Sequence, residues 1–171
     1  MEVLASKRDV RQPASRDEYV VPGTGDPDGA LTNRLYPPQA LRSMFKECDY
    51  VVVLVPKTPE TENLLNAEAI KAMKPGAVLI NLSRGGIVDE EALRKGLETG
   101  ALAGAAFDVF ATEPLPEDSP LWDTPNLIIS PHIAGIMPDY QARATDVFVE
   151  NLQRYLAHRD MINVVDWERG Y

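Results

Sequence analysis

Short apolar runs and helical patterns alternate along most of the chain. Residues 50–55 are a continuous run rich in β-branched side chains, and residues 77–82, 102–107 and 127–130 are further short apolar runs. Continuous runs of this length are typical of parallel strands buried on both faces, so we expect such a strand at 50–55. A shorter run, Val3 to Ala5, predicts a strand at the start of the chain.

Helical patterns with recognisable caps lie between the runs, and a Pro- and Gly-rich stretch at residues 11–34 predicts a turn-rich loop. Strands that alternate with helices of this length imply βαβ units, so the predicted fold class is α/β with a parallel sheet. The predicted helices start at Pro37-Pro38, run from the cap Asn66 through Met73, run from the cap Asp89 to about Glu98, and extend from about Pro138 to His158.

The charge balance narrows the classes of partner. The chain has 26 acidic and 17 basic residues and a formal net charge of −9. This balance disfavours nucleic acid and anionic membranes, because both reward clusters of Lys and Arg. No apolar run reaches about 18 residues, and the N-terminal sequence lacks the layout of a signal peptide. We therefore expect a cytoplasmic protein without a membrane span.

The Cys and His residues have no spacing that is typical of a metal site. Cys48 is the single cysteine, and the histidines are His132 and His158. Cys48 precedes an apolar run at an expected helix end, so we interpret it as a structural thiol. We expect neither a metal nor an internal disulfide.

Four polar residues follow the predicted strands, where ligands bind in open α/β sheets. Arg84 lies in a Gly-rich turn after the strand at 77–82, Asp108 and Glu113 follow the strand at 102–107, and His132 follows the last strand. Each alone has an ordinary explanation: a surface Arg in a tight turn, solvated loop carboxylates, or a structural His.

Together the four residues predict an active site, because the ends of parallel strands meet at one edge of the sheet. A carboxylate bonded to the His132 imidazole would hold its tautomer. The imidazole could then donate a proton to a carbonyl oxygen while a nicotinamide supplies hydride. Arg84 could grip a carboxylate in two places, as in a 2-oxo acid.

Five motifs closely resemble the D-2-hydroxyacid dehydrogenase family, which includes phosphoglycerate dehydrogenases and glyoxylate/hydroxypyruvate reductases. The resemblance covers nearly the whole chain, in order and spacing. The motifs are Val55-Pro56-Lys57-Thr58-Pro59-Glu60-Thr61, residues 81–90 (Asn-Leu-Ser-Arg-Gly-Gly-Ile-Val-Asp-Glu), Ala106-Phe107-Asp108-Val109-Phe110, Glu113-Pro114-Leu115-Pro116 and Pro131-His132-Ile133-Ala134-Gly135.

The resemblance implies a role for each matching residue. Arg84 matches the arginine that binds the substrate carboxylate and carbonyl, His132 the general acid/base, and Glu113 its carboxylate partner. Asp108 matches the acid near the nicotinamide carboxamide. Residues beside the cofactor would also include Arg84 and His132 themselves, Pro56 and Thr61 near the adenosine and ribose, Leu82 and Ser83 near the nicotinamide, Ala134 and Gly135 in the backbone after Ile133, and Ser6, Lys7 and Arg8.

The resemblance also implies that parts of the family's enzyme are absent from this sequence. No G-x-G-x-x-G turn occurs, and residues 1–8 match the second strand of the family's cofactor domain. We therefore expect a Rossmann-like parallel sheet flanked by helices that lacks its first, central strand and the substrate domain. Residues 1–137 would form a partial NAD(P)-binding domain. Residues 138–171 would form a long helix and tail that in the family returns toward the substrate domain.

Loss of the first strand has two expected consequences. In the strand order 3-2-1-4-5-6 it separates strand 2 from strand 4 and leaves open edges. It also removes the helix N-terminus that binds the pyrophosphate. We expect an impaired or inactive enzyme with weak dinucleotide binding, and self-association as a homodimer or larger assembly.

The cofactor and the function leave alternatives open. Ser6-Lys7-Arg8 is hydroxyl and basic where NAD enzymes favour an acid, which suits the 2′-phosphate of NADP, although a solvated basic turn is the alternative. The cofactor is therefore NAD or NADP, with a lean to NADP. The main hypothesis is an oxidoreductase for a small 2-oxo or 2-hydroxy acid of undetermined identity. The alternatives are a non-catalytic truncated product or an assembly or corepressor-like module of the same fold.

Overall fold

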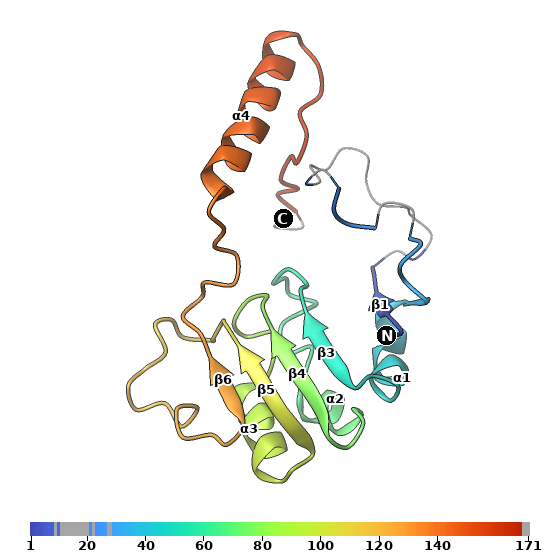
Figure 1. Cartoon of the computed structure of the whole chain (residues 1–171), viewed down its shortest axis with the longest axis vertical. Coiled ribbons are helices and arrows are strands. Elements are labelled where there is room, and N and C mark those ends of the chain that lie inside the picture. The colour runs from blue at the N-terminus through green and yellow to red at the C-terminus, as the bar shows by residue number, and fades with distance from the viewer. Residues whose placement is uncertain (9, 11–20, 22, 27–28, 169–171) are drawn as a thin grey trace. The chain divides into compact units, whose positions relative to one another are not determined.

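The computed structural model describes residues 1–8, 10, 21, 23–26 and 29–168. It divides into two compact units, one of residues 38–134 and one of residues 1–37 with 135–171 (Figure 1). The expected division of the chain into a partial cofactor domain at 1–137 and a long helix with its tail at 138–171 stays a prediction. No helix within the described ranges is long and apolar enough to cross a membrane.

The unit of residues 38–134 is built on a parallel four-stranded sheet. Its strands are β3 (Tyr50–Val53), β4 (Ala77–Asn81), β5 (Leu102–Phe107) and β6 (Leu127–Ile129), in the order β3-β4-β5-β6. All four arrows in Figure 1 point to the same edge. The four strands predicted in this region are confirmed, each to within two residues at either end.

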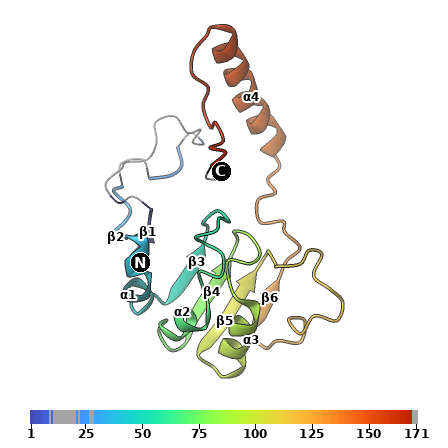
Figure 2. The same cartoon turned by 180° about the vertical axis from the view of Figure 1, so that it is seen from behind.

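Helices cover one face of this sheet. The short helices η1 (Pro38–Ala40) and α1 (Leu41–Phe45) precede β3, α2 (Ala67–Lys71) precedes β4, and α3 (Glu90–Glu98) follows it. Figure 2 shows α2 and α3 in front of the sheet, and Figure 1 shows them behind it. Their apolar side chains, together with those on the covered side of the strands, form the core.

The predicted N-cap residues begin helices α2 and α3. The Asn66 side chain accepts a hydrogen bond from the Ala69 amide, and the Asp89 side chain accepts from the amides of Glu91 and Ala92. Both side chains satisfy amides that have no partner within the helix. Both predicted caps are confirmed. They could be predicted because a cap depends only on residues close in sequence.

The opposite face of the sheet is exposed, which corrects the prediction that the strand at 50–55 is buried on both faces. Along β3, exposed and buried residues alternate, and Tyr50 and Val52 are 67% and 51% exposed. Leu54, just after the strand, and Ile128 in β6 are each 69% exposed. A continuous apolar run predicts burial on both faces only when a second layer covers it, and the described part of this unit has helices on one face alone.

The second unit contains a small parallel sheet and a long helix. Strand β1 (Leu4–Ser6) pairs with β2 (Arg34–Tyr36), and α4 (Tyr140–Leu156) lies in the C-terminal part of the chain. The predicted strand at the start of the chain and the predicted long helix are confirmed. Strand β2 was not predicted, because its three residues contain one aliphatic side chain, Leu35. Much of the predicted loop at 11–34 lies outside the described residues.

The two sheets are separate. Within the described residues, β1 pairs with β2 alone, and β3 pairs with β4 alone. This agrees with the expectation that the second strand of the Rossmann order is not joined to the fourth. The α/β class and the parallel sheet flanked by helices are confirmed.

Candidate active site

A histidine and a glutamate form a direct pair beyond the carboxyl ends of β5 and β6. The Nδ1 atom of His132 lies 2.8 Å from Oε2 of Glu113. The other carboxylate oxygen of Glu113 accepts a hydrogen bond of 2.9 Å from the Phe110 amide, within the same loop. The His132 and Glu113 side chains are 45% and 35% exposed, so a small molecule can reach them from solvent.

These contacts favour the ionised form of Glu113. The hydrogen bond from His132, followed by that from the Phe110 amide, holds the pKa of Glu113 below its ordinary value. An ionised carboxylate only accepts hydrogen bonds, so Nδ1 of His132 carries the proton shared in this pair. The Nε2 atom is then the ring nitrogen that remains for proton exchange with a ligand.

Asp108 secures the loop that carries His132. It is 2% exposed, and its Oδ1 accepts from Ser130 Oγ at 2.6 Å and from the Ile133 amide at 2.9 Å. Its Oδ2 accepts from the Ala134 amide at 2.8 Å. Burial alone would raise the pKa of Asp108, but these three hydrogen bonds outweigh it and leave the pKa below the ordinary value.

The backbone at His132 is in the left-handed region, with φ of +55°. A residue with a Cβ adopts this conformation at a cost, typically about 1 kcal/mol or more, unless its surroundings enforce it. Here the His132 amide donates to the Asp108 carbonyl at 2.8 Å, and the next two amides bind the Asp108 carboxylate. Asp108 therefore holds the turn that aims the imidazole at Glu113.

The loop after β4 packs against the loop that carries Glu113. A Cβ atom added to Gly85 would lie 1.8 Å from the carbonyl oxygen of Phe110, so only glycine fits at this contact. The side chain of its neighbour Arg84 is exposed, and Nη1 donates to the Ser83 carbonyl at 2.7 Å. Backbone packing thus joins the turn of Arg84 to the loop of Glu113, and the guanidinium itself binds the Ser83 carbonyl.

The other predicted cofactor residues of this unit lie in loops after β3 and β4. Thr61 Oγ1 donates to the Pro56 carbonyl at 2.7 Å, which closes a compact turn after β3. Ser83 is buried, and its hydroxyl donates to Asn81 Oδ1 at 2.6 Å. Leu82 is 40% exposed at the end of β4 and offers an apolar surface at this edge of the sheet.

The remaining predicted cofactor residues belong to the other unit. Ser6 is the last residue of β1, and Lys7 and Arg8 follow it. The Lys7 amide donates to the Tyr36 carbonyl, which continues the pairing of β1 with β2. The basic sequence therefore does stand at a strand end, as predicted.

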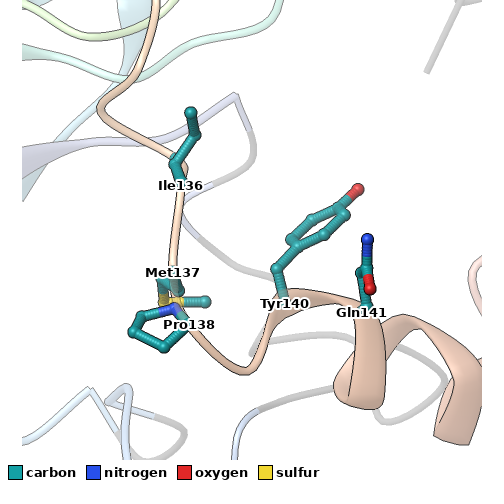
Figure 3. A pocket seen from close by; sticks show the side chains of 6 residues that line it. Ile136, Met137, Pro138, Tyr140 and Gln141 are labelled. Carbon is teal, nitrogen blue, oxygen red and sulfur yellow. The ribbon is translucent and has the colours of Figure 1, made fainter.

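Gly135 lines an open hollow in the same unit. Figure 3 labels the other lining residues, which are Ile136, Met137, Pro138, Tyr140 and Gln141. All six come from one stretch of chain, and none is part of the His132–Glu113 pair. Within the described residues, no cluster of His, Cys, Asp or Glu could hold a metal ion.

Sequence reasoning missed two parts of this arrangement. Ser130 binds Asp108, and the Phe110 amide binds Glu113. Ser130 lies two residues before His132, so a hydroxyl near a strand-end carboxylate was available as a signal. The Phe110 contact uses a backbone atom and has no signal in the sequence.

Comparison with known proteins shows the family to which the chain belongs. Residues 23–134 match the model of the NAD-binding domain of D-isomer specific 2-hydroxyacid dehydrogenases. The chain belongs to the D-isomer specific 2-hydroxyacid dehydrogenase family. This finding confirms the resemblance on which the residue roles were predicted.

Curated members of the family are similar over most of this chain. The D-3-phosphoglycerate dehydrogenase of Synechocystis sp. is 50% identical over 105 residues, which are 61% of this chain and 19% of the relative. The glycerate dehydrogenase of Methylorubrum extorquens is 40% identical over 74% of this chain and 40% of its own length. The chain thus spans less than half the length of these two relatives.

A solved family structure has the same fold. The D-isomer specific 2-hydroxyacid dehydrogenase of Xanthobacter autotrophicus, in complex with NADPH and MES, superposes with a TM-score of 0.81 at 35% identity. The match covers 99% of this chain and 63% of that chain. The parallel sheets and helices described above are therefore those of this family's fold.

Proposed function

We propose that this chain carries the proton-transfer centre of an NAD(P)-dependent dehydrogenase that acts on a small 2-oxo or 2-hydroxy acid. The observation that supports this most directly is the pair in which Glu113 Oε2 lies 2.8 Å from Nδ1 of His132. The pair lies at the edge of the sheet where α/β folds bind ligands, and it has the chemistry of a general acid/base with its orienting carboxylate.

The pair accounts for the proton that carbonyl reduction requires. With Nδ1 bound to the Glu113 carboxylate, a protonated His132 donates from Nε2 to the carbonyl oxygen of the substrate. Glu113 stabilises the imidazolium before the transfer and fixes the neutral tautomer after it. In the oxidative direction, neutral Nε2 accepts the proton of the substrate hydroxyl.

Arg84 is the proposed group for the substrate carboxylate. Its turn packs against the loop of Glu113 at Gly85, and its guanidinium is exposed. A guanidinium presents parallel N–H donors that match a carboxylate, which fits a 2-oxo acid held beside the imidazole. Substrates named for relatives include glyoxylate and hydroxypyruvate, for a reductase of Pectobacterium carotovorum.

The residues at this edge suit the reactive end of a nicotinamide cofactor. When bound, the nicotinamide would supply or accept hydride. Leu82 and Ile133 are 40% and 47% exposed and offer apolar surface for a ring. Asp108, Ser83 and Ala134 would support that surface. Pro56 and Thr61 would lie beside the ribose and adenosine portion. Arg84 and His132 complete the contacts proposed within this unit.

The described residues suit the pyrophosphate of the cofactor less well than they suit its nicotinamide. In the sheet unit, the first turns of α2 and α3 are already capped by Asn66 and Asp89. The cap of α2 occupies one amide and the cap of α3 occupies two, so fewer amides remain for a phosphate. We propose that this chain by itself binds the dinucleotide weakly and turns over slowly. A calorimetric titration that gives a micromolar dissociation constant for NADPH or NADH would contradict this.

Between the two cofactors, NADP is the proposed choice. Lys7 and Arg8 follow β1 directly, where an acid would bind the ribose hydroxyls of NAD. A solved relative from Rhizobium etli contains NADP at 26% identity. The expected result is tighter binding of NADPH than of NADH, with the preference lost in Arg8→Glu. A preference for NADH in the unmodified chain would overturn the choice.

The activity is tested by NADPH oxidation with glyoxylate or hydroxypyruvate at high concentrations of chain and cofactor. We expect a slow rate that falls about 10²–10⁴-fold in His132→Ala, the usual contribution of a general acid/base. The His158→Ala variant is the matched control, since it removes the other histidine and should leave the rate unchanged. Absence of any rate in the unmodified chain, or an equal rate in His132→Ala, would refute the proposed activity.

The non-catalytic alternative is an assembly module, and the exposed sheet face favours self-association. Three apolar side chains on this face are each more than half exposed: Val52 in β3, Leu54 just after it and Ile128 in β6. Strand β3 lies at the edge of the described four-stranded sheet. Such a surface promotes pairing between copies. Light scattering should show a dimer or larger species that Val52→Lys shifts toward monomer. A monomeric unmodified chain would contradict this proposal.

A further inference from the structure

We propose that Glu90 is a positioning residue for the His132–Glu113 pair. Glu90 is the first residue of α3, and its Oε1 accepts a hydrogen bond of 2.6 Å from the amide of Ala111. Ala111 is 21 positions away in sequence and lies in the loop that carries Glu113. Glu90 thus contacts the loop of Glu113 from outside the set of strand-end residues Arg84, Asp108, Glu113 and His132.

The contact completes the support of a short loop. Within residues 110–113, the Phe110 amide binds Glu113 Oε1, and the Phe110 carbonyl packs against Gly85. The next amide along the chain, that of Ala111, binds Glu90. One end of the loop is thereby fixed to the Arg84 turn and to α3, and its other end holds the carboxylate that orients His132.

The presence of a carboxylate at position 90 also has an ordinary explanation, because Glu90 lies in the first turn of helix α3. A carboxylate there interacts favourably with the helix dipole wherever its side chain points. Its neighbour Glu91 lies in the same turn but pairs with Arg94 and Lys95 on the helix itself. Glu91 therefore provides a matched control for the charge, because it shares the dipole interaction while its ion pairs are with residues of the same helix.

The two explanations predict opposite orders for two conservative variants. Glu90→Asp keeps the charge near the helix N-terminus but shortens the side chain, so it loses the Ala111 amide. Glu90→Gln removes the charge but keeps the length and a carbonyl acceptor. If Glu90 acts through the loop, Glu90→Gln resembles the unmodified chain and Glu90→Asp resembles Glu90→Ala. If it acts through the dipole alone, this order is reversed.

The readout is the chemical shift of the ring Nδ1 atom of His132 at one fixed neutral pH, in nuclear magnetic resonance spectra of the full chain. The chain has two histidines, His132 and His158, so His158 is an internal reference. Glu113→Gln should move the Nδ1 signal of His132, because Nδ1 loses its hydrogen bond to a carboxylate. Glu90→Ala and Glu90→Asp should move it in the same direction by a smaller shift. Glu90→Gln and Glu91→Ala should leave it in place.

This inference rests on the proposed function, because positioning matters for catalysis only if the pair transfers protons. The two fail in different ways. Absence of NADPH oxidation refutes the activity but leaves the Nδ1 signal readable without cofactor. An Nδ1 signal of His132 that is equal in the unmodified chain, Glu90→Ala and Glu90→Asp, while Glu113→Gln moves it, overturns the role of Glu90. Equal Nδ1 signals in all variants overturn the pair itself.

Discussion

Nδ1 of His132 lies 2.8 Å from Oε2 of Glu113, and this contact is the main cause of the lowered pKa of Glu113. In His132→Ala the pKa of Glu113 should therefore rise toward its ordinary value of 4.5. The remaining bond from the Phe110 amide should keep the rise incomplete. The measurement is the pH titration of the Glu113 carboxyl carbon, with His158→Ala as the control. A pKa of Glu113 that is the same in both variants would show that the pair does not form in solution.

The contact between Gly85 and the Phe110 carbonyl predicts a strict requirement for glycine. In Gly85→Ala the new methyl group would meet backbone atoms that cannot rotate away, so we expect a loss of about 1–3 kcal/mol or more in the free energy of unfolding. Gly104→Ala is the control, because its Cβ would meet its nearest atom, the Asn126 carbonyl oxygen, at 3.4 Å. Urea denaturation measures both, and equal stabilities would contradict the contact.

The lowered pKa values of Asp108 and Glu113 predict acid sensitivity. Burial raises the pKa of Asp108 but its hydrogen bonds lower it further, and the bond from His132 lowers that of Glu113. Both groups have lower pKa values folded than unfolded. Their stabilisation is therefore complete above the ordinary values of 3.8 and 4.5 and is lost as pH falls through the folded values.

Denaturation from neutral pH down to about pH 3 should show this loss as a falling free energy of unfolding. Asp108→Asn should reduce the slope of the free energy of unfolding against pH in the acid range, because the titrating group is removed. It should also lower stability at neutral pH by about 1–3 kcal/mol, because an amide cannot accept from all three donors. Asp49→Asn, at an exposed pair with Lys74, is the control and should cost less. An Asp108→Asn variant with the acid slope of the unmodified chain would exclude Asp108 as the source.

The fold was predictable where its signals are local. Asn66 and Asp89 cap helices because their side chains reach amides within the next three residues, and the apolar runs of β4 and β5 predict strands on their own. The exposure of Val52 could not be predicted, since burial on both faces depends on elements far away in sequence. Strand β2 was missed because three residues are too few to show the alternation of apolar and polar side chains that is typical of a strand.

The candidate site was predictable in its residue types but not in its contacts. Arg84, Asp108, Glu113 and His132 were identified from strand ends and from family motifs, and the structure pairs two of them directly. The position of Asp108 near a nicotinamide stays a prediction, and its hydrogen bonds to a hydroxyl and two backbone amides were not foreseen. Hydrogen bonds to backbone amides across more than 20 positions leave no pattern in the sequence, which is also why Glu90 was not singled out.

Ser130 offers a test of whether Asp108 controls the His132 turn. Its hydroxyl donates to Asp108 Oδ1 at 2.6 Å and is the strongest of the contacts that lower the pKa of Asp108 against the effect of burial. Ser130→Ala should raise that pKa and cost about 1 kcal/mol of stability, the usual value of one hydrogen bond. The Ile133 amide shares the same oxygen, so its hydrogen exchange should quicken. Ser119→Ala removes a hydroxyl elsewhere in the β5–β6 connection and should leave the exchange at Ile133 unchanged. Equal exchange rates in both variants would mean that the turn is held by the backbone bond between His132 and Asp108 alone.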